Sequence, residues 1–440
     1  MKIGRQLLVG HVSIQICSLL APCRRPILIA TLWAGASWLF FRVARSTRMA
    51  KIWALRSRLE KQPTDLRQNT SYFGDRTLTL DTVRSVKKLT VSVVGGGAGG
   101  RLSLEAAARS ERYELMALAD LRPEVGRELS PKFPALQFFA DYREMFRVCP
   151  TDVVCVSTYP PSHEEVAVEA LSLPLKAILV EKPLGHCVAS GRRILEAVKQ
   201  RNIPMATPHG LMVKRCSLEI IERVQNGEIG ELKLIEIQSP GWDIINAGIH
   251  WLNFAVNLNS RIAVESVLAA CDKTTRTFRD GMQVETVAVT YVKMVNGVRI
   301  VMHSGDTARS NGRRDRDTVT FRIVGTAGQI EFWGWAPDYH LIDARHPEGI
   351  LIAPEEQTTS LHQRHLENLW PMVASGEPDY SLPESSLAAL EICEAAYLSA
   401  RHGVEIQFPL DRFKVPEPND WEPGLPYLGR GGGQNGRHQH

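Results

Sequence analysis

The sequence predicts an α/β protein with two domains: an N-terminal Rossmann dinucleotide-binding domain and a C-terminal α+β domain with an open, mostly antiparallel sheet. Three observations support this. A β-branched run ends in a glycine-rich loop at 89–100. Strand-like and helix-like segments then alternate over about 120 residues, which is typical of a parallel sheet covered by helices. After Lys214, longer runs with alternating polarity replace that pattern.

The elements of the first domain follow one another closely. The strand-like runs and the helix-like segments between them are, in chain order, 89–100, 103–110, 114–120, 151–157, 160–172, 176–183, 190–202 and 203–208. We place this domain at 88–210 and expect it to bind NAD.

The second domain, at 211–410, opens with a helix at 216–230 that glycine ends. Alternating runs at 231–239, 263–272, 284–294, 298–306, 318–326 and 328–335 follow. An Asn-Gly pair within "MVNGVR" predicts a hairpin between two of them. The last helix is expected at 386–403.

Three segments lie outside these domains. Residues 1–50 form an apolar extension, 51–87 a polar lead-in, and 411–440 a glycine-rich tail that we expect to be disordered. The extension has three interpretations: a start codon assigned too early, with synthesis beginning at Met49; an export signal marked by Arg24-Arg25; or a membrane anchor. The first places the protein in the cytoplasm; the others make it exported or membrane-anchored.

Composition excludes several classes of protein. The formal net charge is +4 over 440 residues, and no basic helix or aromatic platform suggests nucleic-acid binding. The eight cysteines include no CxxC pair, and no His/Cys cluster has the spacing of a zinc site. We therefore expect free thiols and no bound metal.

The loop at 95–100 carries a G-x-G-x-x-G motif formed by Gly95, Gly97 and Gly100. In a dinucleotide site, these glycines permit a sharp turn, close approach of the pyrophosphate, and packing of the helix on its strand. Asp120 follows at the end of the next strand, where a carboxylate can accept both ribose hydroxyls of adenosine. This favours NAD, although Arg122 could pair with the 2′-phosphate of NADP.

Lys182 in "LVEKPLG" follows another strand, at the sheet edge where open α/β proteins bind ligands. A desolvated lysine there can exchange a proton with a substrate oxygen. A surface lysine before a turn is the alternative.

Several motifs together resemble the glucose–fructose oxidoreductase / inositol dehydrogenase (Gfo/Idh/MocA) family over about residues 88–410. They are the glycine loop, Asp120, "STYPPSH", "VEKPLG", "NGEIGELKLIEI" and "IVGTAGQIEF". The resemblance implies hydride transfer between NAD(P) and a sugar, cyclitol or related hydroxyl or carbonyl. It also implies a homo-oligomer formed through the open sheet.

The resemblance assigns roles position by position. Gly95, Gly97, Ala98 and Gly100 would hold the pyrophosphate, and Asp120 the adenosine ribose. Thr158, His163 and Glu181 would surround the nicotinamide ribose, and Lys182 would be both a cofactor contact and the catalytic lysine.

In the second domain the family usually has Asp-x-Gly-x-His, and this chain has Asn246-Ala247-Gly248-Ile249-His250. His250 matches the histidine that binds substrate and transfers a proton. Asn246 cannot exchange a proton, but it can hydrogen-bond a hydroxyl or orient His250. Four residues apart, the two would share one face of a helix. We expect proton transfer to depend on Lys182 and His250.

His209, Lys214 and Trp242 are further candidates for substrate contacts, each with a structural role as the alternative. Two other functions stay open. The protein could hydrolyse glycosides by transient oxidation with retained NAD, or it could bind NAD without catalysis, as Asn246 in place of an aspartate allows.

Overall fold

The computed structural model describes residues 87–312, 314, 318–413, 421–426 and 436–438. The apolar extension at 1–50 and nearly all of the lead-in at 51–87 therefore lie outside the described residues. Within the part of the chain that is described, no helix combines the length and apolar character that crossing a bilayer requires.

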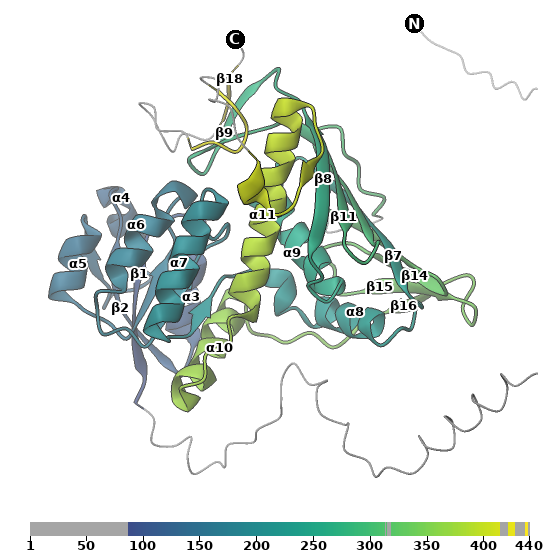
Figure 1. Ribbon diagram of the computed structural model, residues 1–440. Helices are drawn as coiled ribbons and strands as arrows, with labels where there is room; N and C mark the ends of the chain where they lie inside the picture. The colour runs from purple at the N-terminus through teal and green to yellow at the C-terminus, as the bar shows by residue number, and fades with distance from the viewer. Residues whose placement is uncertain (1–86, 313, 315–317, 414–420, 427–435, 439–440) are drawn as a thin grey trace, which may run out of the picture. The chain divides into compact units, whose positions relative to one another are not determined.

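The first domain is built on a six-stranded sheet with the strand order β3-β2-β1-β4-β5-β6. Figure 1 shows helices packed against this sheet, in which β1 and β2 are labelled. Each neighbouring pair is parallel. The strands are β1 Leu89–Val94, β2 Tyr113–Ala119, β3 Gln137–Phe139, β4 Val153–Val156, β5 Ala177–Val180 and β6 Met205–Ala206. The helices are α3 Ala98–Arg109, α4 Pro123–Leu129, α5 Tyr142–Val148, α6 Pro160–Ala170 and α7 Val188–Arg201. The strand order reverses between β1 and β4, which is where such sheets bind dinucleotides.

The second domain contains a nine-stranded sheet with the order β16-β15-β14-β13-β7-β12-β11-β8-β17. Its pairs are antiparallel apart from β7 with β12. The strands are β7 Leu232–Pro240, β8 Val264–Cys271, β11 Val287–Met294, β12 Arg299–Gly305, β13 Thr320–Gly325, β14 Gly328–Phe332, β15 Tyr339–Asp343, β16 Ile350–Ile352 and β17 Ile406–Gln407. Gly297, with φ +87°, forms the predicted turn between β11 and β12.

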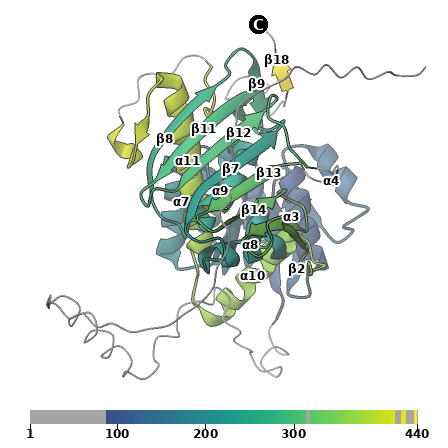
Figure 2. The same ribbon diagram turned by 90° about the vertical axis from the view of Figure 1, so that its right-hand side faces the viewer.

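One face of this sheet is covered and the other is open (Figure 2). Helices α8 (Arg215–Gln225), α9 (Ile249–Leu258) and α11 (Ser381–His402) pack with the inward side chains of the sheet in one apolar core. On the open face Leu268 and Val289 are 47% and 45% exposed. The predicted α/β fold class is confirmed in both domains.

Helix α10 (Leu361–Ser375) leaves the second domain and packs on the first. Leu366, Leu369 and Trp370 join the apolar core of the Rossmann domain, and the Tyr113 hydroxyl donates to the Leu366 carbonyl at 2.6 Å. This helix is not among those predicted from the sequence. Its first turn carries His362 to the Rossmann domain, next to Glu181.

A small third sheet has the order β10-β9-β18 (β9 Arg276–Arg279, β10 Met282–Val284, β18 Gly436–His438). The tip of its hairpin touches the Rossmann domain: a Cβ on Gly281 would lie 3.3 Å from Tyr159 Cβ. Strand β18 belongs to the glycine-rich tail, so this part of the tail is ordered by pairing with β9, and the expectation of disorder is wrong for these residues.

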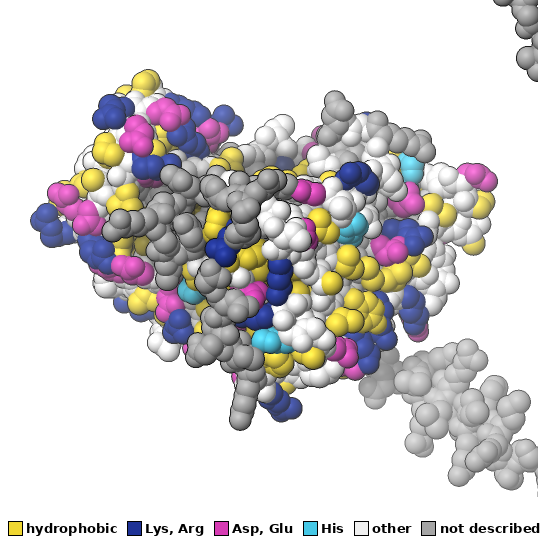
Figure 3. All heavy atoms as spheres, turned by 90° about the horizontal axis from the view of Figure 1, so that it is seen from above, with side chains coloured by type: hydrophobic (Ala, Val, Ile, Leu, Met, Phe, Trp, Pro, Cys, Tyr) yellow, Lys and Arg dark blue, Asp and Glu magenta, His cyan; other side chains and the backbone are white. Residues whose placement is uncertain are grey.

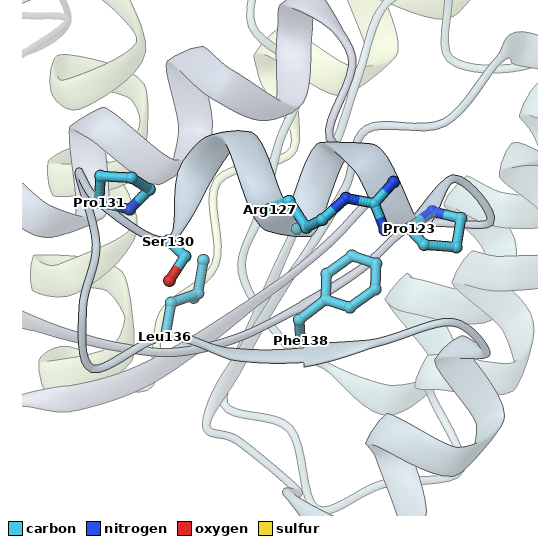
Figure 4. Close-up of a pocket in the computed structure, with 7 residues that line it drawn as sticks. Pro123, Arg127, Ser130, Pro131, Leu136 and Phe138 are labelled. Atoms are coloured by element: carbon cyan, nitrogen blue, oxygen red, sulfur yellow. The ribbon is translucent and has the colours of Figure 1, made fainter.

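On the face shown in Figure 3, Lys and Arg side chains alternate with Asp and Glu rather than gathering by sign. A shallow hollow opens between α4 and β3, lined by Pro123, Gly126, Arg127, Ser130, Pro131, Leu136 and Phe138 (Figure 4). It contains none of the predicted site residues.

Candidate active site

In the glycine loop, the fold requires glycine at two positions and leaves space for a side chain at a third. Gly95 has φ +97°, and a Cβ there would lie 2.5 Å from the Ser157 carbonyl oxygen. A Cβ on Gly100 would lie 1.7 Å from the Gly95 oxygen. A Cβ on Gly97 would meet nothing within 4 Å. Since Gly97 is the N-cap of α3 and no side chain caps it, the open space faces free backbone N–H groups. These features fit a bound pyrophosphate.

Asp120 lies at the end of β2, and its carboxylate is fully engaged. It accepts hydrogen bonds from the Gly96 N–H (2.7 Å) and the Arg122 N–H (2.9 Å). The Arg122 guanidinium contacts both of its oxygens at 3.0 Å. Burial alone would raise the pKa of Asp120, but these hydrogen bonds outweigh burial and hold it below its usual value. Asp120 is therefore ionised and paired with the half-exposed Arg122.

His163 joins two loops at the carboxyl edge of the sheet. Its ring is buried, with Nε2 2.9 Å from the Thr158 carbonyl and Nδ1 3.0 Å from the Pro183 carbonyl. Burial lowers its pKa. A neutral imidazole has one N–H, so His163 donates to one of these two carbonyls and only contacts the other. The Thr158 hydroxyl accepts from Ser162 at 2.9 Å.

Glu181 is buried between the glycine loop and helix α10. A Cβ on Gly99 would lie 2.9 Å from its Oε1. The same oxygen lies 2.7 Å from His362 Nε2. Burial favours the neutral acid. The charge and hydrogen bond of His362, together with the charges of Lys182 and His163, nevertheless lower the pKa of Glu181 overall. No local sequence pattern indicates His362, because α10 is not among the predicted helices.

Lys182 and the 246–250 segment meet across the two domains. Lys182 Nζ donates to the backbone carbonyl of Asn246 at 2.7 Å. The Nδ1 atom of His250 is buried and has no hydrogen-bond partner among the described residues. Burial, followed by the nearby Lys182 ammonium, holds the pKa of His250 well below its ordinary value. The site therefore combines an ammonium with a neutral imidazole.

The segment from Asp243 is not the single α-helix that was expected. Ile244–Gly248 form a π-helical turn, and α9 begins at Ile249. A π-turn has a longer repeat than an α-helix, so spacing by four does not by itself align Asn246 with His250. Such turns often occur at functional sites. Asn246 is held by Asp243, which accepts from its backbone N–H at 2.7 Å and from Nδ2 at 3.0 Å.

The three weaker candidates have different surroundings. His209 is buried, packs its ring 5.2 Å from that of His250, and contacts Ser386 Oγ at 2.8 Å. Lys214 forms a 2.7 Å ion pair with Glu356, whose carboxylate also caps α8, so its contacts are structural. Trp242 is half-exposed beneath the Arg279 guanidinium, 4.4 Å from the ring centroid.

Trp335 is an aromatic residue near His250 that is not among the predicted site residues. Its ring centroid lies 5.7 Å from that of His250, edge to face, and 5.3 Å from that of Trp251. It is 38% exposed, whereas Trp251 is buried. The motif "EFWGWAP", with two tryptophans two residues apart, is the local signal that could have drawn attention to Trp335.

Glu285 is a second residue that the sequence did not indicate. It is buried; Oε1 accepts from the Ile244 N–H at 2.7 Å and Oε2 from the Tyr397 hydroxyl at 2.8 Å. Burial and the negative charge of Asp243 raise its pKa to about 7. Glu285 therefore supports the π-turn and binds a proton near neutral pH.

Replacing Glu285 with glutamine is expected to flatten the pH dependence of stability. The folded pKa is raised above the ordinary value of about 4.3. The stability associated with this group is therefore complete below that value and is lost as the pH rises through 7. One proton changes the free energy of unfolding by at most about 1.4 kcal/mol per pH unit. Urea unfolding between pH 5 and 8 should show a steeper loss in the wild type than in Glu285→Gln; equal slopes would contradict the assignment.

Comparison with known proteins agrees with this geometry. Residues 89–207 match the Gfo/Idh/MocA family model, described as an oxidoreductase family with an NAD-binding Rossmann fold. Myo-inositol 2-dehydrogenase of Thermotoga maritima is 26% identical over 151 residues, 34% of this chain and 45% of that protein. The chain thus spans about half the length of the curated relatives it matches.

Two solved structures share the fold over nearly their whole length. An Agrobacterium radiobacter oxidoreductase in complex with NAD+, L-tartaric acid and magnesium has a TM-score of 0.61 at 17% identity, covering 73% of this chain and 98% of that one. Levoglucosan dehydrogenase in complex with NADH and levoglucosan has a TM-score of 0.62 at 17% identity, covering 73% and 100%.

The fold and the glycine loop define the class of residues 89–207, an NAD-binding Rossmann domain. More specifically, residues 89–207 are similar to the NAD-binding domain of the Gfo/Idh/MocA family.

Proposed function

We propose that the protein is an NAD(P)-dependent dehydrogenase that transfers a hydride between its coenzyme and the CH–OH carbon of a sugar, cyclitol or related polyol. The observation that carries this proposal is the contact between Lys182 and Asn246. It brings an ammonium from the coenzyme-binding edge of the Rossmann sheet to the segment of the second domain that holds His250.

Each residue of this cluster has a chemical role in the proposal. A bound nicotinamide coenzyme would accept or supply the hydride. The Lys182 ammonium would hold the substrate oxygen and stabilise the negative charge that develops on it. The neutral imidazole of His250 would take the hydroxyl proton, and Trp335 with Trp242 would contact the substrate ring.

Coenzyme titration followed by turnover assays tests the proposal. We expect NAD+ to bind in calorimetry and free NADH to accumulate with members of a panel of sugars and cyclitols that includes myo-inositol and levoglucosan. Hydrolysis of glycosides without free NADH would favour the glycosidase alternative. Coenzyme binding without turnover of any compound would favour a non-catalytic NAD-binding protein, which the amide of Asn246 keeps open.

Replacing Asp120 with serine is expected to shift coenzyme preference toward NADP+. The change removes a carboxylate that would repel the 2′-phosphate and releases the Arg122 guanidinium that it now holds. We expect NADP+ to bind about tenfold more tightly and NAD+ about tenfold more weakly, each about 1.4 kcal/mol. Calorimetry with both coenzymes measures this, and an unchanged NAD+/NADP+ ratio would contradict the assigned role of Asp120.

The proposal includes self-association through the open face of the nine-stranded sheet. Leu268 and Val289 are exposed there, and in the pairing register Leu268 lies opposite Tyr291, which pairs with Val301. Contiguous apolar side chains on an uncovered sheet face are typical of interfaces. Light scattering of the purified protein tests this part.

A further inference from the structure

We propose that Asp243, paired with Arg279, is a positioning residue that fixes the amide of Asn246 so that its oxygen, not its nitrogen, faces the substrate. This inference rests on the proposed function. It makes position 246 a neutral hydrogen-bond acceptor that selects substrates presenting a hydroxyl donor at that point.

The contacts of Asp243 determine which end of the amide is free. Oδ1 of Asp243 accepts from both the backbone N–H and Nδ2 of Asn246, and Oδ2 contacts Arg279 Nη1 at 2.6 Å. An ionised carboxylate only accepts hydrogen bonds, so it can bind the nitrogen end of the amide and not the oxygen end. Both Asp243 oxygens accept from N–H donors, Oδ2 from Arg279, so Asp243 offers no donor to the amide oxygen. The amide oxygen therefore points away from Asp243.

The backbone polar atoms of Asn246 also have hydrogen-bond partners. Its carbonyl accepts from Lys182, and its N–H donates to Asp243. Only Oδ1 has no hydrogen-bond partner among the described residues, although Asn246 is 3% exposed. An orphaned acceptor costs free energy when buried, so the geometry points to a ligand donor at this atom.

The charges around Asp243 explain why an amide is retained at 246. Arg279 from β9 neutralises Asp243, while Glu285, Tyr397 and Cys393 also face it. A second carboxylate at 246 would lie within hydrogen-bond distance of Asp243 and near Glu285. Asparagine thus accepts a substrate hydroxyl without adding a further negative charge beside Asp243 and Glu285.

The test uses Asp243→Asn, Asn246→Asp and the double variant in the full-length protein. Asparagine caps a helix as well as aspartate does, so Asp243→Asn keeps the cap and removes the charge that orients the amide. Asp141→Asn is the matched control, because Asp141 caps α5 through Arg143 N–H away from these residues.

Thermal unfolding without ligand gives the first readout. In Asn246→Asp the introduced carboxylate lies beside that of Asp243, and their repulsion raises the pKa of the introduced carboxyl group in the folded state. Stability is therefore lost as the pH rises. We expect a Tm at least about 2 °C below wild type at pH 8, a smaller deficit at pH 5, and recovery of more than half in the double variant. Additive losses in the double variant, or no deficit at pH 8, would overturn the inference.

Steady-state kinetics with the polyol of the panel that is turned over fastest gives the second readout. We expect Asp243→Asn to raise KM about tenfold with little change in kcat, because the acceptor is no longer fixed. Wild-type KM in Asp243→Asn would show that capping is its whole role. If the wild type turns over no polyol, the proposed function fails, and unfolding alone decides the orientation of Asn246.

Discussion

Replacing Lys182 with methionine is expected to lower turnover by about 10²–10⁴-fold and to leave coenzyme affinity nearly unchanged. Methionine keeps most of the side-chain volume but cannot stabilise an alkoxide or share a proton. The described contact of Nζ is with the Asn246 carbonyl, whereas Asp120 accepts from the Gly96 N–H of the glycine loop. Turnover measured by NADH formation, alongside calorimetry with NAD+, separates the two effects.

Lys176→Met is the matched control for this prediction. Lys176 precedes the same strand, β5, at its opposite end, and forms an exposed ion pair with Asp152. We expect it to keep wild-type turnover. Loss of coenzyme affinity in Lys182→Met in proportion to turnover would indicate a binding role, and retained turnover would remove Lys182 from the chemistry.

The sequence predicted the Rossmann domain well because its signals are local. Buried β-branched strands, a glycine loop and Asp120 at a strand end each depend on a few adjacent residues. The same holds for the Asn296-Gly297 turn, where the backbone conformation itself requires glycine. Lys182 was placed at the correct sheet edge by the same logic.

The remainder of the site depends on long-range packing that adjacent residues do not encode. His362 reaches Glu181 across 181 positions, on a helix whose apolar residues pack into the other domain. Lys214, a candidate substrate contact with a structural role as the alternative, pairs with Glu356, 142 positions away, which no local pattern indicates. The π-turn arises where Asp243 and Glu285 both accept backbone N–H groups, and no α-helical periodicity reveals that.

Two glycines of the coenzyme loop are expected to fail in different ways when substituted. Gly100→Ala should destabilise the fold, because its Cβ would overlap the Gly95 carbonyl oxygen at 1.7 Å and α3 would have to shift. Such overpacking typically costs about 1–3 kcal/mol or more. Gly97→Val should fold normally, since Gly97 has φ −70° and its Cβ meets nothing within 4 Å.

Gly97→Val should instead impair coenzyme binding. If the pyrophosphate occupies the open space at the start of α3, the valine methyl groups would fill it, and NAD+ affinity should fall at least about tenfold at an unchanged apo Tm. Thermal unfolding with and without NAD+ measures both effects, because a ligand that binds the native state raises Tm. Gly97→Val protein that NAD+ still stabilises as it does the wild type would show that the dinucleotide does not cross this helix end, whereas a lowered apo Tm would mean that packing rather than the coenzyme restricts position 97.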